Sequence, residues 1–351
     1  MSDALVAVSW TPFKKRYDLA LVGLVLLYLI SFVGIGLVRF PAITLEILLI
    51  RAFGTAALIL LQGILLMGPL ARLDRRWLPL LANRRHAGVV CFLLAFAHAL
   101  LVLLTYHAGG AIDPLLSVFV SDAGLRVTAF PFQAFGFVAL LILFTMAATS
   151  HDFWLSVLTA PVWKSLHMAA YVAWLLLVVH VVFGVLQSET HPVYALLMLL
   201  SVLVMSGMHL AAGWRERAAD RAFAGSAAAD GFIDVCAAGD LQPDRPHAVH
   251  LAGDRIALVR FDGNRVAAVS GVCQHQNGPL SEGRYIDGCL TCPWHGFQYR
   301  LEDGCAPAPF TEKIPVFRVR IAKGRVFVHP VPLAPGTHVE PAILNEAGAN
   351  A

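Results

Sequence analysis

The sequence predicts two domains of different fold class, a six-helix transmembrane all-α bundle followed by an all-β domain. Three observations support this division. The chain of 351 residues is 58% hydrophobic and only 14% charged, whereas roughly 25% of the residues in an ordinary soluble domain are charged. The long charge-free stretches lie before residue 230, and short β-rich segments separated by turn residues lie after it. This composition excludes a disordered chain and argues against a purely soluble one.

Six stretches in the first part are long enough to cross a membrane. A spanning helix needs about 20 apolar residues, and six stretches of about this length contain no Asp, Glu, Lys or Arg. The expected spans are Leu19–Val38, Ala52–Ala71, Ala87–Tyr106, Phe130–Thr149, Leu166–Leu186 and Val193–Ala211. The segment Arg39–Arg51 is amphipathic, and we expect it to lie at the membrane interface. The sequence shows no evident internal repeat.

The distribution of basic residues predicts the orientation of these spans. Cytoplasmic loops carry an excess of Lys and Arg close to the ends of spans. With a cytoplasmic N-terminus, twelve Lys and Arg residues fall in inside segments and three in outside segments. An even number of spans returns the chain to its starting side. We therefore expect both termini and the C-terminal domain to be cytoplasmic, at a bacterial-type inner membrane.

Histidines within the spans are candidates for function, because ionisable residues are costly inside a membrane. His98 lies on the third span and His167 and His180 on the fifth, and His86 directly precedes the third span. A neutral imidazole is a good axial ligand for haem iron, and the core of a helix bundle is a usual place for such a site. These four residues are therefore candidate ligands of b-type haem. The alternative is that they are structural histidines, hydrogen-bonded across helices.

The spacing of these histidines is compatible with either one haem or two haems. The third and fifth spans are parallel, so His86 pairs with His167 on the cytoplasmic side and His98 pairs with His180 deeper in the membrane. Thirteen residues rise about 20 Å along a helix, enough to stack two haems, but they also rotate a straight helix by about 220°. The two candidate ligands on one helix therefore do not lie on the same face of that helix.

Several ordered motifs resemble the ferric-reductase-like transmembrane domain. They are Leu65–Leu73, Arg84–Gly88, Ala97–His98, Thr149–Ser150, and Trp163–His167 followed by His180. Over residues 15–215 the sequence is most similar to the haem membrane subunit of the periplasmic methionine sulfoxide reductase system. The resemblance implies a six-helix bundle that binds b-type haem and passes electrons across the membrane. It places haem ligands at His98, His167 and His180, whereas His86 departs from the family pattern.

The second part contains a Cys–His pattern typical of an iron–sulfur centre. Cys273-Gln274-His275 is followed, after sixteen residues, by Cys292-Pro293-Trp294-His295. Two thiolates and two imidazoles suit a Rieske [2Fe–2S] cluster, in which one iron binds both cysteines and the other both histidines. A four-ligand zinc site is the alternative. Glycine and proline turn residues after each pair favour two loops that close over a cluster.

The segments around this pattern predict an all-β domain. Ala257–Phe261 and Val266–Val269 are β-rich and flank a hairpin turn, and Val316–Ile321 with Val326–His329 repeat the pattern. The expected domains are a haem-binding transmembrane domain over 1–214, a linker over 215–230, a Rieske domain over 231–330 and a mobile tail over 331–351.

Over Phe232–Pro330 the sequence resembles the Rieske ferredoxin family. High-potential members carry an extra cysteine in each ligand loop and a serine two residues after the second histidine. Here these positions hold Gly278, Trp294 and Phe297, while Tyr299 is retained. A lost hydrogen bond to a cluster sulfur lowers the reduction potential. The resemblance therefore implies a cluster near the low end of the Rieske range.

Two redox domains in one chain predict a membrane electron relay. Electrons would pass between the cytoplasmic cluster and b-type haem, towards an acceptor at the opposite face. No Gly-x-Gly-x-x-Gly follows a strand, so no dinucleotide domain of that type is expected. The donor would be a separate cytoplasmic flavin reductase or quinol, and a periplasmic redox partner would complete the path through the lipid bilayer. Nucleic acid is not an expected partner.

Other functions remain as alternatives to the relay. A terminal ferric or oxygen reductase differs only in its acceptor, and a membrane-tethered redox sensor would need no haem. The sequence does not decide whether flavin or quinone binds to the membrane domain. It assigns no catalytic residue. A Rieske oxygenase is disfavoured, because its mononuclear iron needs two histidines and a carboxylate and no pair with the spacing His-x4-His occurs.

Overall fold

The structure of the protein is a computed structural model. It describes residues 12–74, 76–77, 80–81, 84–120, 132–150, 154, 157–158, 160–221, 230–275, 278–293, 296–308 and 310–344. The chain forms two compact units. The first, called the helical unit, comprises Pro12–His151 and Ser165–Ala212. The second, called the β unit, comprises Gly213–Ala351 together with Asp152–Lys164 and Met1–Thr11.

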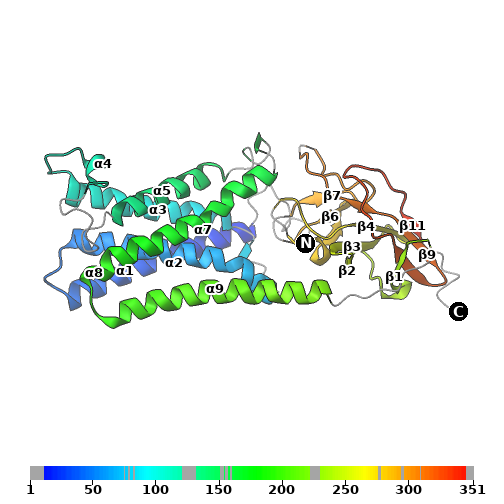
Figure 1. Cartoon of the computed structure of the whole chain (residues 1–351), viewed down its shortest axis with the longest axis horizontal. Helices are drawn as coiled ribbons and strands as arrows, with labels where there is room; N and C mark the ends of the chain where they lie inside the picture. Colours follow the sequence, from blue (N-terminus) through cyan, green and yellow to red (C-terminus); the bar gives the residue numbers. More distant parts are fainter. Residues whose placement is uncertain are drawn as a thin grey trace. The chain divides into compact units, whose positions relative to one another are not determined.

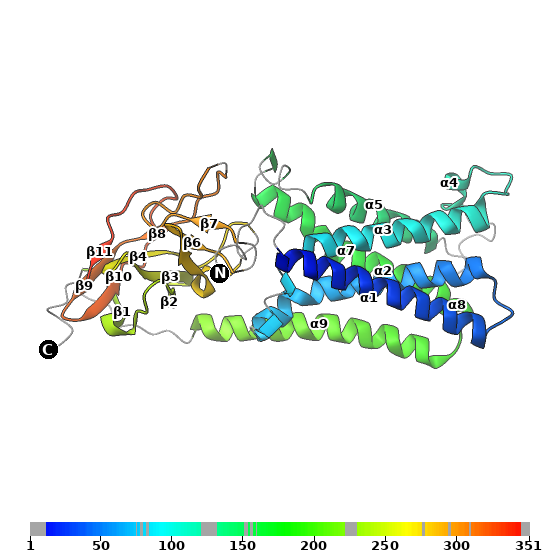
Figure 2. The ribbon, with the colours of Figure 1, turned by 180° about the vertical axis from the view of Figure 1, so that it is seen from behind.

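The helical unit is a bundle of long apolar helices that run alongside one another (Figure 1). The helices are α1 (Pro12–Arg39), α2 (Leu45–Leu73), α3 (Arg84–Val102) with the π-helix η3 (Leu103–His107), α4 (Pro114–Ser117), α5 (Phe132–Ala148), α7 (Ala160–Phe183), α8 (Val185–Ser188) and α9 (Pro192–Arg221). The view from behind shows α1 lying along α2 (Figure 2). The first turn of α7 belongs to the β unit, and the rest of α7 belongs to the bundle.

The predicted membrane domain is confirmed. Among the described residues, five helices are long and apolar enough to cross a membrane, and α5 is a shorter apolar helix of 17 residues. Each predicted span therefore coincides with a helix. The predicted interfacial segment Arg39–Arg51 is wrong in part, because α2 already begins at Leu45. Glu46 in the first turn favours this early start, since a negative charge stabilises a helix N-terminus.

A polar contact fixes three helices of the bundle to one another. The side-chain oxygen of Gln62 on α2 accepts hydrogen bonds from Trp174 Nε1 at 2.7 Å and from Ser201 Oγ at 3.0 Å. The amide nitrogen of Gln62 donates to the carbonyl oxygen of Ser201 at 2.9 Å. The half-buried amide thus has hydrogen-bond partners within the apolar bundle, and α2, α7 and α9 are held together.

The described residues of the β unit form three antiparallel sheets. Its strands are β1 (Ile233–Ala237), β2 (His247–Leu251), β3 (Asp254–Phe261), β4 (Arg265–Ser270), β5 (Arg284–Ile286), β6 (Cys289–Thr291), β7 (Gln298–Tyr299), β8 (Val316–Phe317), β9 (Val319–Ala322), β10 (Arg325–Val328) and β11 (Ala342–Ile343), with 3-10 turns η5 (Ala238–Asp240) and η6 (Leu280–Glu282). The sheet orders are β1-β10-β9, β11-β4-β3-β2 with β8 also on β4, and β5-β6-β7.

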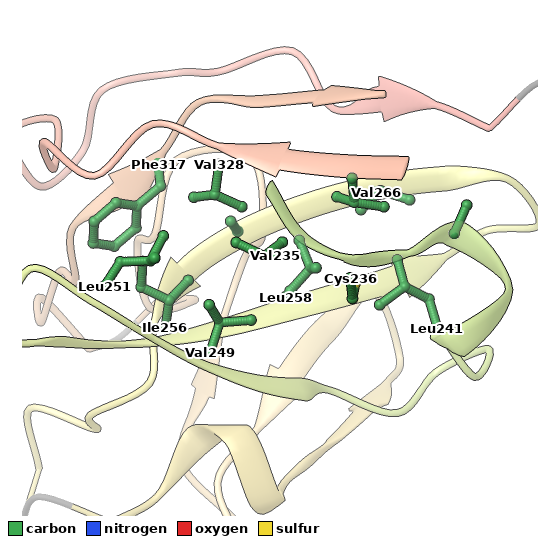
Figure 3. Packing of buried hydrophobic residues seen from close by; sticks show 13 residues of the cluster. Val235, Cys236, Leu241, Val249, Leu251, Ile256, Leu258, Val266, Phe317 and Val328 are labelled. Atoms are coloured by element: carbon green, nitrogen blue, oxygen red, sulfur yellow. The ribbon is translucent and has the colours of Figure 1, made fainter. Parts of the chain in front are cut away.

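The core of the β unit is formed by side chains from the first two sheets (Figure 3). Val249 and Leu251 on β2 are buried and alternate with less buried residues, as the two-residue period of a strand predicts. On β3 all four residues from Ile256 to Val259 are buried, and Ile256 and Leu258 belong to this cluster. Burying each such side chain stabilises the fold by about 1.5–3 kcal/mol. The third sheet lies outside this cluster and carries the second predicted ligand loop.

The structure refines the predicted strands. The hairpin of β3 and β4 is confirmed, and its turn residues Asp262 and Gly263 both have positive φ angles. The predicted strand Val316–Ile321 is interrupted at Arg318. The physical reason is that β8 pairs with β4 whereas β9 pairs with β10, so the chain passes from one sheet to another at this residue.

Two predicted segments differ from the structure. The linker predicted over 215–230 begins later, because α9 continues to Arg221 through residues with good helix propensity. The mobile tail predicted over 331–351 is wrong for residues 331–344. In this stretch β11 pairs with β4, and the backbone nitrogens of Leu333 and Val339 donate to the carbonyl oxygens of Val316 and Glu302 at 2.9 and 2.8 Å. Residues 345–351 lie outside the described residues.

Candidate functional site

His98 on α3 and His180 on α7 lie next to each other in the helical unit. Their ring centres are 6.4 Å apart and their ring planes make an angle of 87°. Nδ1 of His98 lies 2.9 Å from the carbonyl oxygen of Ile50, and Nδ1 of His180 lies 3.0 Å from the carbonyl oxygen of Phe132. A carbonyl oxygen can only accept, so each Nδ1 carries the proton. Nε2 of each ring is then the nitrogen with a lone pair for a metal.

Two glycines allow the imidazoles to reach these carbonyl oxygens. A Cβ atom at Gly54 would lie 2.8 Å from Nδ1 of His98, and a Cβ atom at Gly136 would lie 2.8 Å from Nδ1 of His180. Both distances are shorter than real Cβ contacts. Small residues let helices approach closely within a membrane, and here they let an imidazole pack directly on a neighbouring backbone.

The two halves of this arrangement form an internal repeat. In each half, a histidine contacts two residues of the preceding long helix. One is the residue whose backbone carbonyl oxygen binds Nδ1 of the histidine, and the other is a glycine four residues later in the sequence. The two sets are Ile50, Gly54, His98 and Phe132, Gly136, His180, each member of the second lying 82 residues after its counterpart. Both glycines end the tripeptide Ala-Phe-Gly. The expectation of no internal repeat is therefore corrected for these positions, although few of them are identical.

The histidine pair fits a bis-imidazole haem site. Two imidazoles that bind one metal ion through Nε2, each at about 2 Å, have ring centres roughly 6 Å apart, which agrees with the separation of 6.4 Å. Histidine ligands commonly donate their other N–H to a carbonyl group, as both do here. Haem bound at this pair would supply one-electron chemistry at its iron.

The other two predicted haem ligands have different surroundings. His86 on α3 is exposed, and its Nδ1 lies 2.8 Å from Asp18 Oδ2 on α1. His167 is half-buried on α7. Neither is part of the internal repeat, because Met168 occupies the position equivalent to His86 and Arg85 the position equivalent to His167. The structure thus brings His98 and His180 together in a repeated setting that His86 and His167 do not share.

Two loops of the β unit carry the predicted cluster ligands. Cys273 and His275 follow β4, and Cys292 follows β6. All three side chains are buried. His295 lies outside the described residues. Within the part of the chain that the structure describes, no three His, Cys, Asp or Glu side chains are placed to hold one metal ion.

Backbone hydrogen bonds fold each ligand loop back on itself. The nitrogen of Cys273 donates to the carbonyl oxygen of Gly278 at 2.9 Å, and the nitrogen of Cys292 donates to that of Phe297 at 2.7 Å. A Cβ atom at Gly283 would overlap the carbonyl oxygen of Thr291. Position 283, where the segment after the first ligand loop packs against β6, therefore requires glycine. The sequence had indicated Gly283 as a turn residue.

Tyr299 on β7 contacts the first ligand loop. Its hydroxyl lies 3.5 Å from Cys273 Sγ and accepts a hydrogen bond from the backbone nitrogen of Gln274 at 3.1 Å. Burial, followed by the nearby Cys273 sulfur, raises the pKa of Tyr299 far above its usual range. The hydroxyl therefore keeps its proton and can donate to the sulfur. Hydrogen bonds to cluster sulfurs are one of the factors that set the potential.

An aromatic cluster contacts His275 through Phe297. The ring of Phe297 stacks on the imidazole, with ring centres 5.3 Å apart and planes at 21°. Phe310 and Tyr299 pack against Phe297 with ring centres at 4.8 and 5.4 Å. At the position of the serine expected in high-potential relatives, the chain thus places an apolar ring against a predicted ligand.

Comparisons with known families agree with both units. Residues 53–178 match the ferric reductase like transmembrane component, and residues 231–318 match the Rieske [2Fe-2S] domain. The first match includes His98 and His167 and ends before His180. The second match includes all four predicted cluster ligands.

The curated relatives match the Rieske part. The ferredoxin component of the alkene monooxygenase system of Xanthobacter autotrophicus is 32% identical over 103 residues, which cover 29% of this chain and 84% of that protein. Ferredoxin CarAc of Metapseudomonas resinovorans is 33% identical over 98 residues, which cover 28% of this chain and 92% of that protein. A cholesterol 7-desaturase of Ciona intestinalis is 28% identical, and the chain spans 19% of its length.

Solved structures match the same part of the chain. The ferredoxin of carbazole 1,9a-dioxygenase from Nocardioides aromaticivorans is 25% identical, with a TM-score of 0.27 and coverage of 28% of this chain and 98% of that chain.

An apolar helical domain and an iron–sulfur domain in one chain define a membrane redox protein that transfers electrons. Through residues 231–318 the chain belongs to the Rieske [2Fe–2S] family, and its membrane domain is a ferric-reductase-like transmembrane component. A Rieske [2Fe–2S] cluster is accordingly its cofactor.

Proposed function

We propose that this protein relays electrons between a cytoplasmic Rieske cluster and a b-type haem within the membrane, towards an acceptor at the opposite face. The proposed cluster ligands are Cys273, His275, Cys292 and His295, and the proposed haem ligands are His98 and His180. The cysteines would bind one iron of the cluster and the histidines the other.

The observation that carries this proposal is the geometry of His98 and His180. A structural role would account for a hydrogen bond from one ring nitrogen to a neighbouring helix. It would not account for two histidines at a ring-centre distance of 6.4 Å, each with Nδ1 bound to a carbonyl oxygen and each backed by a glycine. A shared iron accounts for all of these features, because both Nε2 atoms are then ligands.

The proposal places one haem in each chain. The internal repeat supports a site on His98 and His180, whereas His86 and His167 lie outside the repeat. A second haem on His86 and His167 is the alternative. The distribution of Lys and Arg supports a cytoplasmic β unit. A separate flavin reductase, or quinol, would then exchange electrons with the chain, and a periplasmic partner would meet its outer side.

Haem content tests the proposed ligands. We expect His98→Ala and His180→Ala each to lose haem in a pyridine haemochrome assay of the purified full-length protein. His191→Ala is the matched control, because His191 is an exposed histidine at the start of α9. The electron paramagnetic resonance (EPR) signal of the reduced cluster should persist in all three variants and report that the β unit is folded. Full haem content in both His98→Ala and His180→Ala would contradict the proposal.

Proteoliposomes test the relay itself. Dithionite outside the vesicle reduces the cluster of outward-facing molecules, and trapped ferricyanide inside reports electrons that cross the bilayer. We expect reduction of ferricyanide with the wild-type protein and with His191→Ala, and none above the empty-vesicle rate with His98→Ala or His180→Ala. Transfer that persists in a haem-free variant would show that the relay does not use this haem.

A further inference from the structure

Trp163, in the first turn of α7, packs against the predicted cluster ligand His275. Both residues belong to the β unit, which includes the segment Asp152–Lys164. Their ring centres are 5.8 Å apart and their planes make an angle of 26°, a stacked arrangement of the kind that aromatic pairs favour. Trp163 and His275 are each only 2% exposed.

The imidazole of His275 therefore has two nearly parallel aromatic neighbours. Phe297 comes from its own domain, and Trp163 comes from the start of a membrane helix. Apolar rings limit the access of water to a metal ligand and restrict its orientation, and both effects tune a metal centre. An imidazole that is 2% exposed also offers almost no surface to a soluble partner. Its contacts with Phe297 and Trp163 connect this ligand to two other parts of the chain.

The helix that carries Trp163 also carries predicted haem ligands. α7 is continuous from Ala160 to Phe183, and it includes His167 and His180. His167 is one helical turn after Trp163, about 6 Å along the axis and on the same face of the helix. The helix whose first turn holds Trp163 thus also carries His167 and His180 further along the chain.

We propose that Trp163 is an aromatic bridge between the cluster and α7. It holds His275 in position and provides the contact through which an electron passes between this ligand and the helix. The inference rests on the proposed relay. For each electron transferred towards the membrane, the reduced cluster is oxidised by one electron and ferric haem is reduced by one. Trp163 itself is neither oxidised nor reduced, so it is a positioning and coupling residue.

Three variants of the full-length protein test the bridge. Trp163→Leu removes the aromatic ring, and Trp163→Phe keeps a ring at the same position. Trp214→Leu is the matched control, because Trp214 also lies near a helix end of the β unit but is 76% exposed. Haem and cluster content are measured first, so that only loaded protein is compared.

The cluster itself provides two readouts that do not depend on electron transfer. Reduction adds a negative charge to the cluster, and water stabilises a charge better than an apolar ring does. We therefore expect Trp163→Leu to raise the midpoint potential of the cluster and to shift its EPR g values. Trp163→Phe should restore both towards wild type, and Trp214→Leu should leave both unchanged. Wild-type g values and potential in Trp163→Leu would overturn the proposed contact.

Transfer kinetics provide the third readout. In stopped-flow mixing with dithionite, the cluster is monitored by visible absorbance and the haem by its α band. We expect Trp163→Leu to lose the fast phase of haem reduction and Trp163→Phe to recover part of it. A fast phase that survives in Trp163→Leu, despite shifted g values, would overturn the bridge while leaving the stacking contact and the relay intact. Wild-type protein that reduces its cluster but never its haem would instead overturn the proposed function.

Discussion

Gly54→Ala is the substitution that most directly tests how the histidine pair is supported. Helix propensity alone predicts that replacing glycine by alanine in α2 stabilises the helix by about 1 kcal/mol. The structure predicts the opposite for haem binding. The new Cβ atom would lie 2.8 Å from Nδ1 and 3.0 Å from Cε1 of His98. The imidazole must then move, and its hydrogen bond to the carbonyl oxygen of Ile50 is weakened or lost.

The size of the effect follows from the role of that hydrogen bond. Loss of a group that orients a metal-ligating histidine weakens metal binding by about 10–100-fold, equivalent to about 1.4–2.8 kcal/mol. Haem titration of the apoprotein, followed by the Soret band, measures the affinity. Gly63→Ala is the control on the same helix, because a Cβ atom there would meet nothing within 4 Å. The internal repeat predicts that Gly136→Ala behaves like Gly54→Ala.

The control makes this prediction refutable. If Gly54→Ala and Gly63→Ala bind haem with the same affinity as the wild type, the imidazole of His98 does not pack on Gly54 in the loaded protein. The proposed orientation of the ligand would then be wrong. If Gly54→Ala weakens binding but Gly136→Ala does not, the two halves of the site are not equivalent, and the argument from the repeat fails.

Two substitutions and one deletion further probe the β unit. Tyr299→Phe removes a hydroxyl 3.5 Å from Cys273 Sγ, so we expect a lower midpoint potential in a redox titration; an unchanged potential would show that the hydroxyl makes no hydrogen bond to the sulfur. Gly304→Ala should destabilise the β unit by more than about 1 kcal/mol in thermal unfolding, because Gly304 has a φ angle of +67° and a Cβ atom would overlap a carbonyl oxygen. Gly239→Ala, with open space around it, should not. Deleting residues 331–351 should lower the unfolding temperature of the β unit, because β11 and its backbone hydrogen bonds are lost; an unchanged temperature would mean that this segment adds no stability.

The helices were predictable because apolar length decides them. Each of the six charge-free stretches coincides with a helix, since a chain inside a bilayer must satisfy its backbone hydrogen bonds internally. The ends of the helices were harder to predict. α2 starts within the predicted interfacial segment, and α9 continues past residue 214 to Arg221. Charge marks where a chain leaves the membrane, whereas helix propensity marks where the helix ends.

Strand order and the C-terminal segment were not predictable in the same way. The turn at Asp262–Arg265 identifies the β3–β4 hairpin because the pairing is local. The pairing of β11 with β4 joins Ala342 to Val266 across a long stretch of chain. The Ala- and Pro-rich composition of residues 331–344 gave no sign of it, because the stability of this segment comes from backbone hydrogen bonds to distant residues.

The internal repeat leads to a final prediction, on the number of haems. Sequence spacing alone allowed two pairs of histidines, since the two members of each pair lie at similar depths on parallel helices. The structure shows that the pair His98 and His180 is supported by equivalent carbonyl groups and glycines 82 residues apart. Such support is invisible in the sequence until the contacts identify which residues correspond. In the repeat, Met168 is equivalent to His86, and Arg85 is equivalent to His167. The repeat therefore supports one haem site and not two. We therefore expect the pyridine haemochrome assay to give one haem per chain, unchanged in His86→Ala, and a ratio of two that falls in His86→Ala would refute this reasoning.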